Sequence, residues 1–192
     1  MGYNDKYYKR HLEQYQEWEN DIGKHIFNMF KPESILDLGC GVGSYLEGAV
    51  LSGCEDVLGV ELNLKYARPY LVDVIISDII RGDITRDLDI KRKFDCVVSF
   101  EVGEHIEPDG TIGFIDNLTR YSSNYIILTA AAPGQGGTGH INLREKKFWI
   151  DSIESKGFLY QEQLVDLCKI VWKQFDPGSY ILKNLMIFAH GY

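Results

Sequence analysis

The sequence lacks any apolar stretch long enough to cross a bilayer, although hydrophobic residues make up 45% of its 192 residues. A membrane-spanning helix takes roughly 20 consecutive apolar residues, so we expect no membrane insertion. Residues 3–20 are polar and aromatic and do not resemble a secretory signal peptide. The sequence therefore predicts a soluble, cytoplasmic, globular protein.

Paired cysteines and an excess of basic residues are also missing. The four cysteines show no paired spacing, which fits a reducing compartment. The net charge of −8 argues against a large phosphate-binding surface, because nucleic-acid-binding proteins normally carry a basic face. RNA is therefore disfavoured as a partner, although it stays open, and the sequence leaves the oligomeric state undetermined.

No internal repeat, low-complexity tract or linker interrupts the chain, which predicts a single domain over residues 1–192. Apolar residues at steps of three or four over about residues 9–30 indicate an amphipathic helix, and Pro32 follows it. Such a helix can cover a sheet or act as a lid over a binding site. The sequence does not choose between these roles.

After this helix, short apolar runs alternate with helical patterns. We expect strands at residues 34–38, 57–60, 79–80, 95–100, 125–129 and 180–189. We expect helices at about residues 43–51, 64–71, 109–120, 145–155 and 161–175, with Asp109 as a cap. This alternation predicts an α/β fold with a mostly parallel sheet and right-handed crossovers.

The most informative stretch joins the first predicted strand to the next helix. Asp37 is followed by three glycines at alternate positions, Gly39, Gly41 and Gly43. Glycine allows a tight turn and a close approach of backbone to a ligand, and ligands of open α/β sheets bind at such turns. The pattern is not the G-x-G-x-x-G of dinucleotide enzymes, and the loop has no Lys-Ser/Thr pair of a P-loop. A ligand without phosphates is therefore favoured.

Two later positions extend this site. Glu61 lies 18 residues after Gly43, at the end of the second predicted strand, where a carboxylate can accept hydrogen bonds from both ribose hydroxyls. Asp83 and Ile84 follow the third strand, where they can bind the exocyclic amine and pack on the ring of an adenine. Together these residues predict a site for an adenosine-containing cofactor.

A second group of polar residues follows the fourth predicted strand. Glu101, Glu104 and His105 come directly after it, and His140 lies 35 residues beyond His105 in a glycine-rich loop. Two carboxylates and two imidazoles are a plausible divalent-metal set with open positions. A metal-free histidine base and a purely structural role are the alternatives.

The stretch Asp37–Gly43 with Glu61, Asp83 and the strand at 95–100 resembles the class I S-adenosylmethionine-dependent methyltransferases over roughly residues 35–129. The resemblance implies a Rossmann-like seven-stranded sheet with helices on both faces and an antiparallel last strand. Residues 180–189 would be that last strand, and residues 158–160 are a weak candidate for the sixth. It also implies S-adenosylmethionine as the cofactor, bound by Asp37, Gly39, Gly41, Gly43, Glu61, Leu62, Asp83, Ile84 and Glu101.

Within that superfamily, the E-x-x-E-H pattern with a later histidine is similar to two groups. These are the small-RNA 3′-terminal 2′-O-methyltransferases and the O-methyltransferases of ubiquinone biosynthesis. The first group implies Mg²⁺ or Mn²⁺ held by Glu101, Glu104, His105 and His140. Catalytic roles then fall on His140, His105 and Glu104, with the histidines as ligands or bases.

The sequence thus predicts a methyltransferase acting on a hydroxyl oxygen of a small molecule or saccharide. An Asn/Asp-Pro-Pro-aromatic motif, more usual in N-methyltransferases, is absent after the fourth strand. Three alternatives stay open: methylation of an RNA 2′-hydroxyl, a non-catalytic S-adenosylmethionine-binding module, and a nicotinamide-dependent oxidoreductase.

Overall fold

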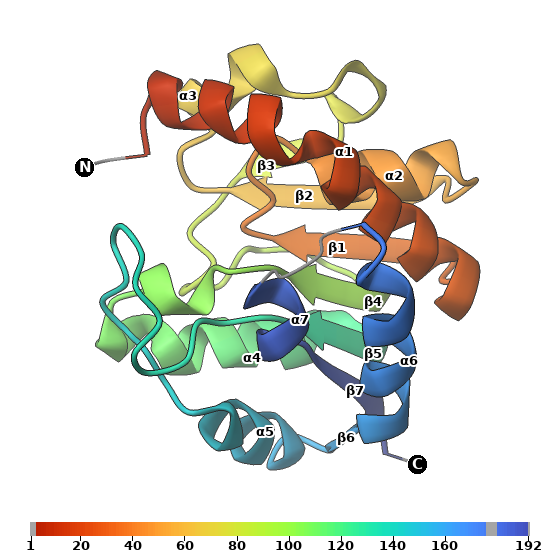
Figure 1. The fold of residues 1–192 in the computed structure, drawn as a ribbon, viewed down its shortest axis with the longest axis vertical. Helices are drawn as coiled ribbons and strands as arrows, with labels where there is room; N and C mark the ends of the chain where they lie inside the picture. The colour runs from red at the N-terminus through yellow and green to blue at the C-terminus, as the bar shows by residue number, and fades with distance from the viewer. Residues whose placement is uncertain (1–2, 176–179, 192) are drawn as a thin grey trace. The chain divides into compact units, whose positions relative to one another are not determined.

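A computed structural model describes residues 3–175 and 180–191 of the chain. The strands form a seven-stranded sheet of order β3-β2-β1-β4-β5-β7-β6, which is mostly parallel with β7 antiparallel (Figure 1). This confirms the expected Rossmann-like fold class. The chain divides into two compact units, Met1–Asp83 and Ile84–Tyr192, and a single domain over residues 1–192 stays a prediction.

The first unit carries three parallel strands in the order β3-β2-β1. Its elements are α1 (Asp5–Phe30), β1 (Ser34–Leu38), α2 (Ser44–Leu51), β2 (Asp56–Glu61), α3 (Leu64–Ala67), η1 (Arg68–Tyr70), η2 (Asp73–Ile75) and β3 (Ile79–Arg81). All five residues of β1 are buried, as expected for a central strand with both faces covered. Asp37 pairs with Gly59 and Glu61 with Arg81, so both acidic residues lie near the carboxyl ends of their strands.

Helix α1 packs closely along α2 (Figure 1). A Cβ on Gly23 would lie 2.0 Å from the Tyr45 carbonyl oxygen, and one on Gly48 would lie 2.0 Å from the Asn20 carbonyl oxygen. The two backbones therefore touch where these glycines face the partner helix. Since Ile22 of α1 is fully buried as well, this part of α1 is scaffold.

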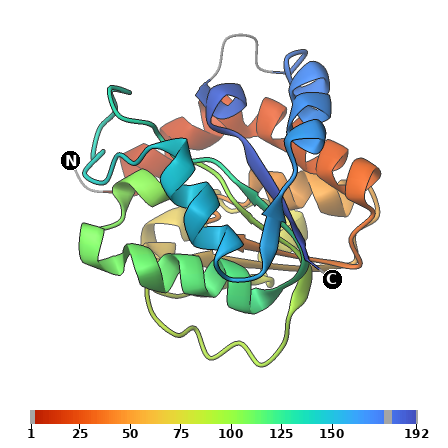
Figure 2. The same cartoon turned by 90° about the horizontal axis from the view of Figure 1, so that it is seen from below.

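The second unit has the strand order β4-β5-β7-β6, with β4 parallel to β5 and β7 antiparallel to both of its neighbours. Its elements are β4 (Phe94–Ser99), η3 (Gly103–His105), η4 (Pro108–Gly110), α4 (Thr111–Tyr121), β5 (Ser122–Leu128), α5 (Lys146–Glu154), β6 (Phe158–Tyr160), α6 (Glu162–Trp172), α7 (Tyr180–Asn184) and β7 (Met186–His190). Figure 2 shows α4 and α6 on opposite sides of these strands. The largest fully buried side chains of this unit are Trp149, Trp172, Phe94, Phe114, Phe158 and Phe188.

Two expectations about the second unit are wrong. Residues 180–189 were expected as one strand, but the segment begins as the short helix α7 and only continues as β7. Ile181 and Asn184 are the buried residues of α7, and their spacing of three is helical. Asp109 was expected as a helix cap, but the N-cap of α4 is Gly110, with no side-chain hydrogen bond.

Among the described residues, no helix combines the length and the apolar character that crossing a membrane requires. All four cysteines are buried, and none of them forms a disulfide within the part of the chain that the structure describes.

Candidate active site

The turn after β1 has the backbone that the three glycines predict. Gly39, Gly41 and Gly43 have φ values of 90°, 56° and 87°, a region that side-chain-bearing residues rarely adopt. A Cβ on Gly43 would lie 2.2 Å from Cδ1 of Ile75, so this glycine is required for packing as well. A Cβ on Gly41 would meet nothing within 4 Å. The backbone at Gly41 is therefore open to a ligand.

Glu61, at the end of β2, lies beside this turn and is hydrogen-bonded to it. Its Oε2 accepts a hydrogen bond from the Gly41 N–H at 3.1 Å. Its Oε1 accepts from the Asn63 N–H at 2.7 Å and from the Tyr8 hydroxyl at 2.9 Å. Burial raises the pKa of Glu61, and these three hydrogen bonds oppose that rise. The acidic residue expected to bind ribose is thus held rigidly beside the glycine turn.

Two further carboxylates are buried near Glu61. Asp37 is 1% exposed, and its Oδ2 has no hydrogen-bond partner among the described residues. Burial, reinforced by the charges of Glu19 and Glu61, raises the pKa of Asp37 well above its ordinary value. Glu19 is buried on α1 and lies 3.0 Å from Nε2 of His11. Three carboxylates with one imidazole suit a ligand that carries positive charge.

The remaining residues expected at the cofactor site follow strands β2 and β3. Leu62 directly follows β2 and is 50% exposed. Asp83 lies two residues beyond β3 and is partly exposed. Ile84 opens the second unit and is buried, and its carbonyl accepts a hydrogen bond from Nδ2 of Asn117 at 2.8 Å.

In the second unit, Glu101 follows β4 in a strained conformation with φ 52°. Its N–H donates to the carbonyl and to the hydroxyl of Thr129, at 3.2 and 2.8 Å. The carboxylate accepts from Nε2 of Gln135 at 3.2 Å and from Nδ2 of Asn184 at 3.1 Å. Nδ2 of Asn184 also donates to Oε1 of Gln135 at 3.0 Å, which closes a triangle. Glu101 is therefore fixed by two distant segments of the chain.

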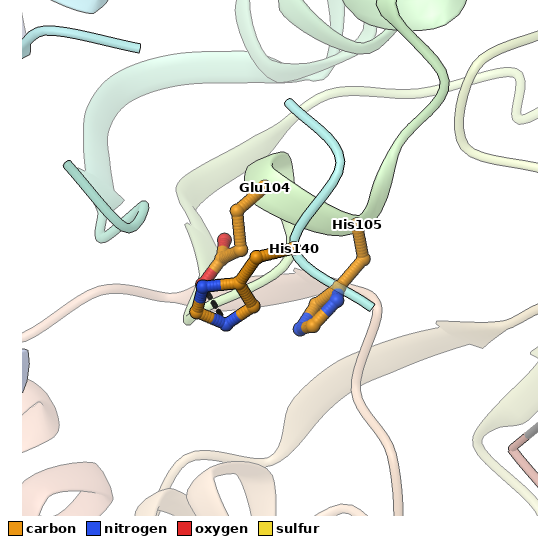
Figure 3. Close-up of side chains that lie close together, drawn as sticks. All are labelled: Glu104, His105 and His140. Atoms are coloured by element: carbon orange, nitrogen blue, oxygen red, sulfur yellow. Dashed lines mark ion pairs between the residues drawn. The ribbon is translucent and has the colours of Figure 1, made fainter. Parts of the chain in front are cut away.

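Glu104, His105 and His140 gather beside one another (Figure 3). Each offers one ligand atom, and these atoms all lie within 4.8 Å of one another. Nε2 of His140 is 4.0 Å from Oε1 of Glu104, and the two imidazole centroids are 5.0 Å apart. Sequence reasoning placed four residues in this set, whereas the cluster that the structure brings together contains these three.

Backbone carbonyls orient both imidazoles. Nδ1 of His105 lies 3.0 Å from the Gly139 carbonyl oxygen, and Nδ1 of His140 lies 3.2 Å from that of Gln135. A carbonyl only accepts, so Nδ1 carries the proton on each ring and Nε2 of the neutral ring keeps its lone pair. Burial lowers the pKa of His105, and the charge of His140 adds to this.

Glu104 is buried, and the imidazole of His140 lies 4.0 Å from its carboxylate. Its side chain is fully buried, and neither carboxylate oxygen accepts a hydrogen bond from the described residues. Burial, with the charge of Glu101 second, raises the pKa of Glu104 to about 8. An unpartnered buried carboxylate is costly, so this group favours a cation or a proton beside it.

Asn142 clamps the glycine-rich loop to this cluster. The N–H groups of Ile141 and Asn142 donate to the Glu104 carbonyl at 2.9 and 3.0 Å. The Asn142 side chain donates to the Gly103 carbonyl at 3.0 Å and to the Thr111 hydroxyl at 2.9 Å. Asn142 is buried, so it places the backbone of Glu104 beside the loop that carries His140.

The sequence did not predict which side chains surround Glu61 or which one from the last segment binds Glu101. Tyr8, His11 and Glu19 come from α1, and their only signal was their position in the aromatic and acidic first half of that helix. Asn184 was hidden in a segment expected to be strand. No local pattern links any of these residues to a site.

Comparison with known proteins identifies the family and the fold of the chain. Residues 8–133 match the family model described as "Methyltransferase domain". A ubiquinone biosynthesis O-methyltransferase of Nitrobacter winogradskyi is 30% identical over 79 residues, which cover 40% of this chain and 30% of that protein.

Two solved structures share the fold over nearly the whole chain. A sugar N-methyltransferase from Streptoalloteichus sp. ATCC 53650 has a TM-score of 0.73 and 14% identity, covering 100% of this chain and 94% of that one. An S-adenosylmethionine-bound amino pentose methyltransferase from Micromonospora echinaspora has a TM-score of 0.66 and 14% identity, covering 95% and 94%.

The glycine turn, the seven-stranded sheet and the family match together define an S-adenosylmethionine-dependent methyltransferase of class I. The chain belongs to the methyltransferase domain family.

Proposed function

We propose that the protein transfers a methyl group from S-adenosylmethionine to a hydroxyl oxygen of a small molecule or saccharide. The observation that carries this proposal is the cluster of Glu104, His105 and His140, with a buried carboxylate that accepts no hydrogen bond from the described residues and two imidazoles whose Nδ1 atoms lie against backbone carbonyls. A hydroxyl is a weak nucleophile, so its methylation requires a group that takes its proton.

The donor is assigned to the residues around the glycine turn and to those that the family resemblance adds. Gly39, Gly41 and Gly43 bring backbone close to it, and Glu61 accepts from its ribose. The buried carboxylate of Asp37 favours its positive charge. The full proposed set is Asp37, Gly39, Gly41, Gly43, Glu61, Leu62, Asp83, Ile84 and Glu101.

His140 is the proposed base. As the acceptor oxygen bonds to the methyl carbon, the carbon–sulfur bond breaks and its electron pair stays on sulfur, which gives S-adenosylhomocysteine. The hydroxyl proton passes to Nε2 of His140, and the nearby Glu104 carboxylate stabilises the imidazolium that forms. His105 supplies a second acceptor nitrogen at the same place.

The same three residues fit a divalent cation. One carboxylate without a hydrogen-bond partner and two imidazoles oriented by carbonyls form a typical ligand set with open positions. Bound there, a divalent metal would take Nε2 of His140 as a ligand, so it would replace His140 as the base and act as a Lewis acid that lowers the pKa of the acceptor hydroxyl. Mn²⁺ suits imidazole ligands better than Mg²⁺, which prefers oxygen ligands in octahedral geometry.

A methyl-transfer assay on the purified chain tests the proposal. The acceptors are small phenols, neutral saccharides, amino sugars and a short RNA with a free 3′ end, each assayed after chelation and after Mn²⁺ or Mg²⁺ is returned. We expect ether formation on a phenol or saccharide, lost on chelation and restored best by Mn²⁺. Unchanged activity after full chelation refutes the metal and leaves His140 as the base.

Variants and alternative acceptors sharpen this test. His140→Ala should lower turnover at least about 100-fold, whereas His190→Ala should not, because His190 is the exposed last residue of β7. Methylation confined to amino sugars or to RNA would replace the hydroxyl proposal. Donor binding without methylation of any acceptor class would favour a non-catalytic binding module.

A further inference from the structure

The hydrogen bond between Tyr8 and Glu61 joins the first turns of α1 to the carboxylate assigned to the ribose. The Tyr8 hydroxyl donates to Oε1 of Glu61 at 2.9 Å, and both residues are buried. They lie 53 positions apart in the sequence. A buried tyrosine ring usually has a polar partner for its hydroxyl, but here the partner is a residue assigned to cofactor binding.

The acceptor capacity of Glu61 shows what this bond does. A carboxylate has about four lone-pair sites, two on each oxygen. Tyr8 and Asn63 take both sites on Oε1, and Gly41 takes one on Oε2. One site on Oε2 is left, on the oxygen that faces the open glycine turn.

The surroundings of Tyr8 keep this arrangement rigid. Its ring packs edge-on against Tyr7 at 5.2 Å between centroids, and the ladder of rings continues through His11 and Tyr15. The start of α1 is capped by Asn4, whose side chain accepts from the Tyr7 N–H at 3.2 Å. The Tyr8 hydroxyl is therefore held in place before any ligand arrives.

We propose that Tyr8 is a positioning residue of the methyl-donor site: its hydroxyl occupies Oε1 of Glu61 and so directs Oε2 toward a ribose hydroxyl of the donor. This inference rests on the assignment of Glu61 to the donor. It gives α1 a role in binding in addition to its packing on α2. The ligand class it concerns is the adenosine half of S-adenosylmethionine and S-adenosylhomocysteine.

The pH dependence of ligand affinity reports on the charge of Glu61 and would not change if Tyr8 only contributed packing. The hydrogen bond from Tyr8 favours the ionised carboxylate, against the burial that raises the pKa of Glu61. The other titratable groups around Glu61 are His11 on α1, Asp37 at the end of β1 and Cys40 in the turn. These are the same with or without the Tyr8 hydroxyl, so they cancel when a variant is compared with the wild type at each pH.

The test is calorimetric titration of the full chain and of Tyr8→Phe with S-adenosylhomocysteine and, separately, with 5′-methylthioadenosine, which keeps the ribose but lacks the amino acid. We expect Tyr8→Phe to weaken both ligands about tenfold at pH 8, and more at pH 5.5, because Glu61 becomes easier to protonate. Tyr15→Phe is the matched control, since Tyr15 lies on the same helix and in the same ladder without a hydrogen bond from its hydroxyl among the described residues. It should bind within twofold of the wild type.

The outcomes separate this inference from the proposed function. Equal affinity of Tyr8→Phe and wild type, or a weakening that is the same at both pH values, overturns the positioning role. No binding of S-adenosylhomocysteine by the wild type would instead overturn the donor assignment. Glu61→Ala serves as the positive control and should weaken both ligands at least as much as Tyr8→Phe.

Discussion

Replacing the buried carboxyl of Glu104 by an amide should remove most of a large pH dependence of stability. The pKa of Glu104 is raised from 4.5 to about 8 by burial and by the charge of Glu101. An unfolded chain releases this proton near pH 4–5, whereas the folded chain keeps it up to about pH 8. The folded state therefore binds more protons across that window, so the free energy of unfolding falls as the pH rises through it.

The size of the effect follows from the width of the window. Each pH unit between the two pKa values changes the free energy of unfolding by about 1.4 kcal/mol per proton. Between pH 5.5 and 8.5 the wild type should therefore lose about 3 kcal/mol from this group alone. Glu104→Gln has no proton to release and should lack this loss.

The assay is urea unfolding followed by the fluorescence of the three tryptophans, in chelator, at pH 5.5 and 8.5. Glu107→Gln is the control, because Glu107 is exposed and lies three residues further along. It should keep the wild-type pH dependence. Parallel pH dependences for the wild type and Glu104→Gln would refute the reasoning. Mn²⁺ at pH 8.5 should restore stability to the wild type and not to Glu104→Gln, because the cation replaces the proton.

Two further perturbations test the turn and the loop clamp. Gly43→Ala should destabilise the protein by about 2–4 kcal/mol and abolish donor binding, because its φ is 87° and the new Cβ would meet Ile75. Gly41→Ala, at φ 56° with open space, should cost only about 1 kcal/mol in denaturant unfolding; equal costs would contradict the packing argument. Asn142→Ala should cost about 2–4 kcal/mol and weaken Mn²⁺ binding, because buried hydrogen-bond partners lose their donor. Asn124→Ala is its control, because Asn124 is an exposed residue of β5, and an unchanged Mn²⁺ affinity in Asn142→Ala would show that the clamp does not position the cluster.

Local pattern was enough for most secondary structure. The run at 34–38 coincides with β1, whereas β6 at 158–160 was expected only because the family resemblance implies a sixth strand. An apolar pattern, β-branched residues and glycines that end a strand all affect the backbone within a few residues. Strand positions can therefore be predicted from neighbouring residues in the sequence. The prediction of a single strand over residues 180–189 was wrong, because an apolar run of that length suits a helix followed by a strand equally well.

The candidate site was only partly predictable. Glu104, His105 and His140 were expected together, and they lie together in the structure. Glu101 was expected with them as a fourth ligand, and this stays a prediction: its charge acts on Glu104, while Gln135 and Asn184 donate hydrogen bonds to its carboxylate. Such partners depend on side-chain directions that sequence spacing does not show.

The sequence by itself determined the glycine turn, the acidic residues at the strand ends and hence the class of cofactor, because these features depend on backbone freedom and on strand order. The tertiary structure alone decided which distant side chains complete each group. β7 runs antiparallel with Met186 opposite Leu128, so Asn184, two residues before β7, reaches the end of β5 where Glu101 is tethered. In the first unit, the packing of α1 brings Tyr8 to Glu61 across 53 positions, a contact between remote segments that no local pattern could specify.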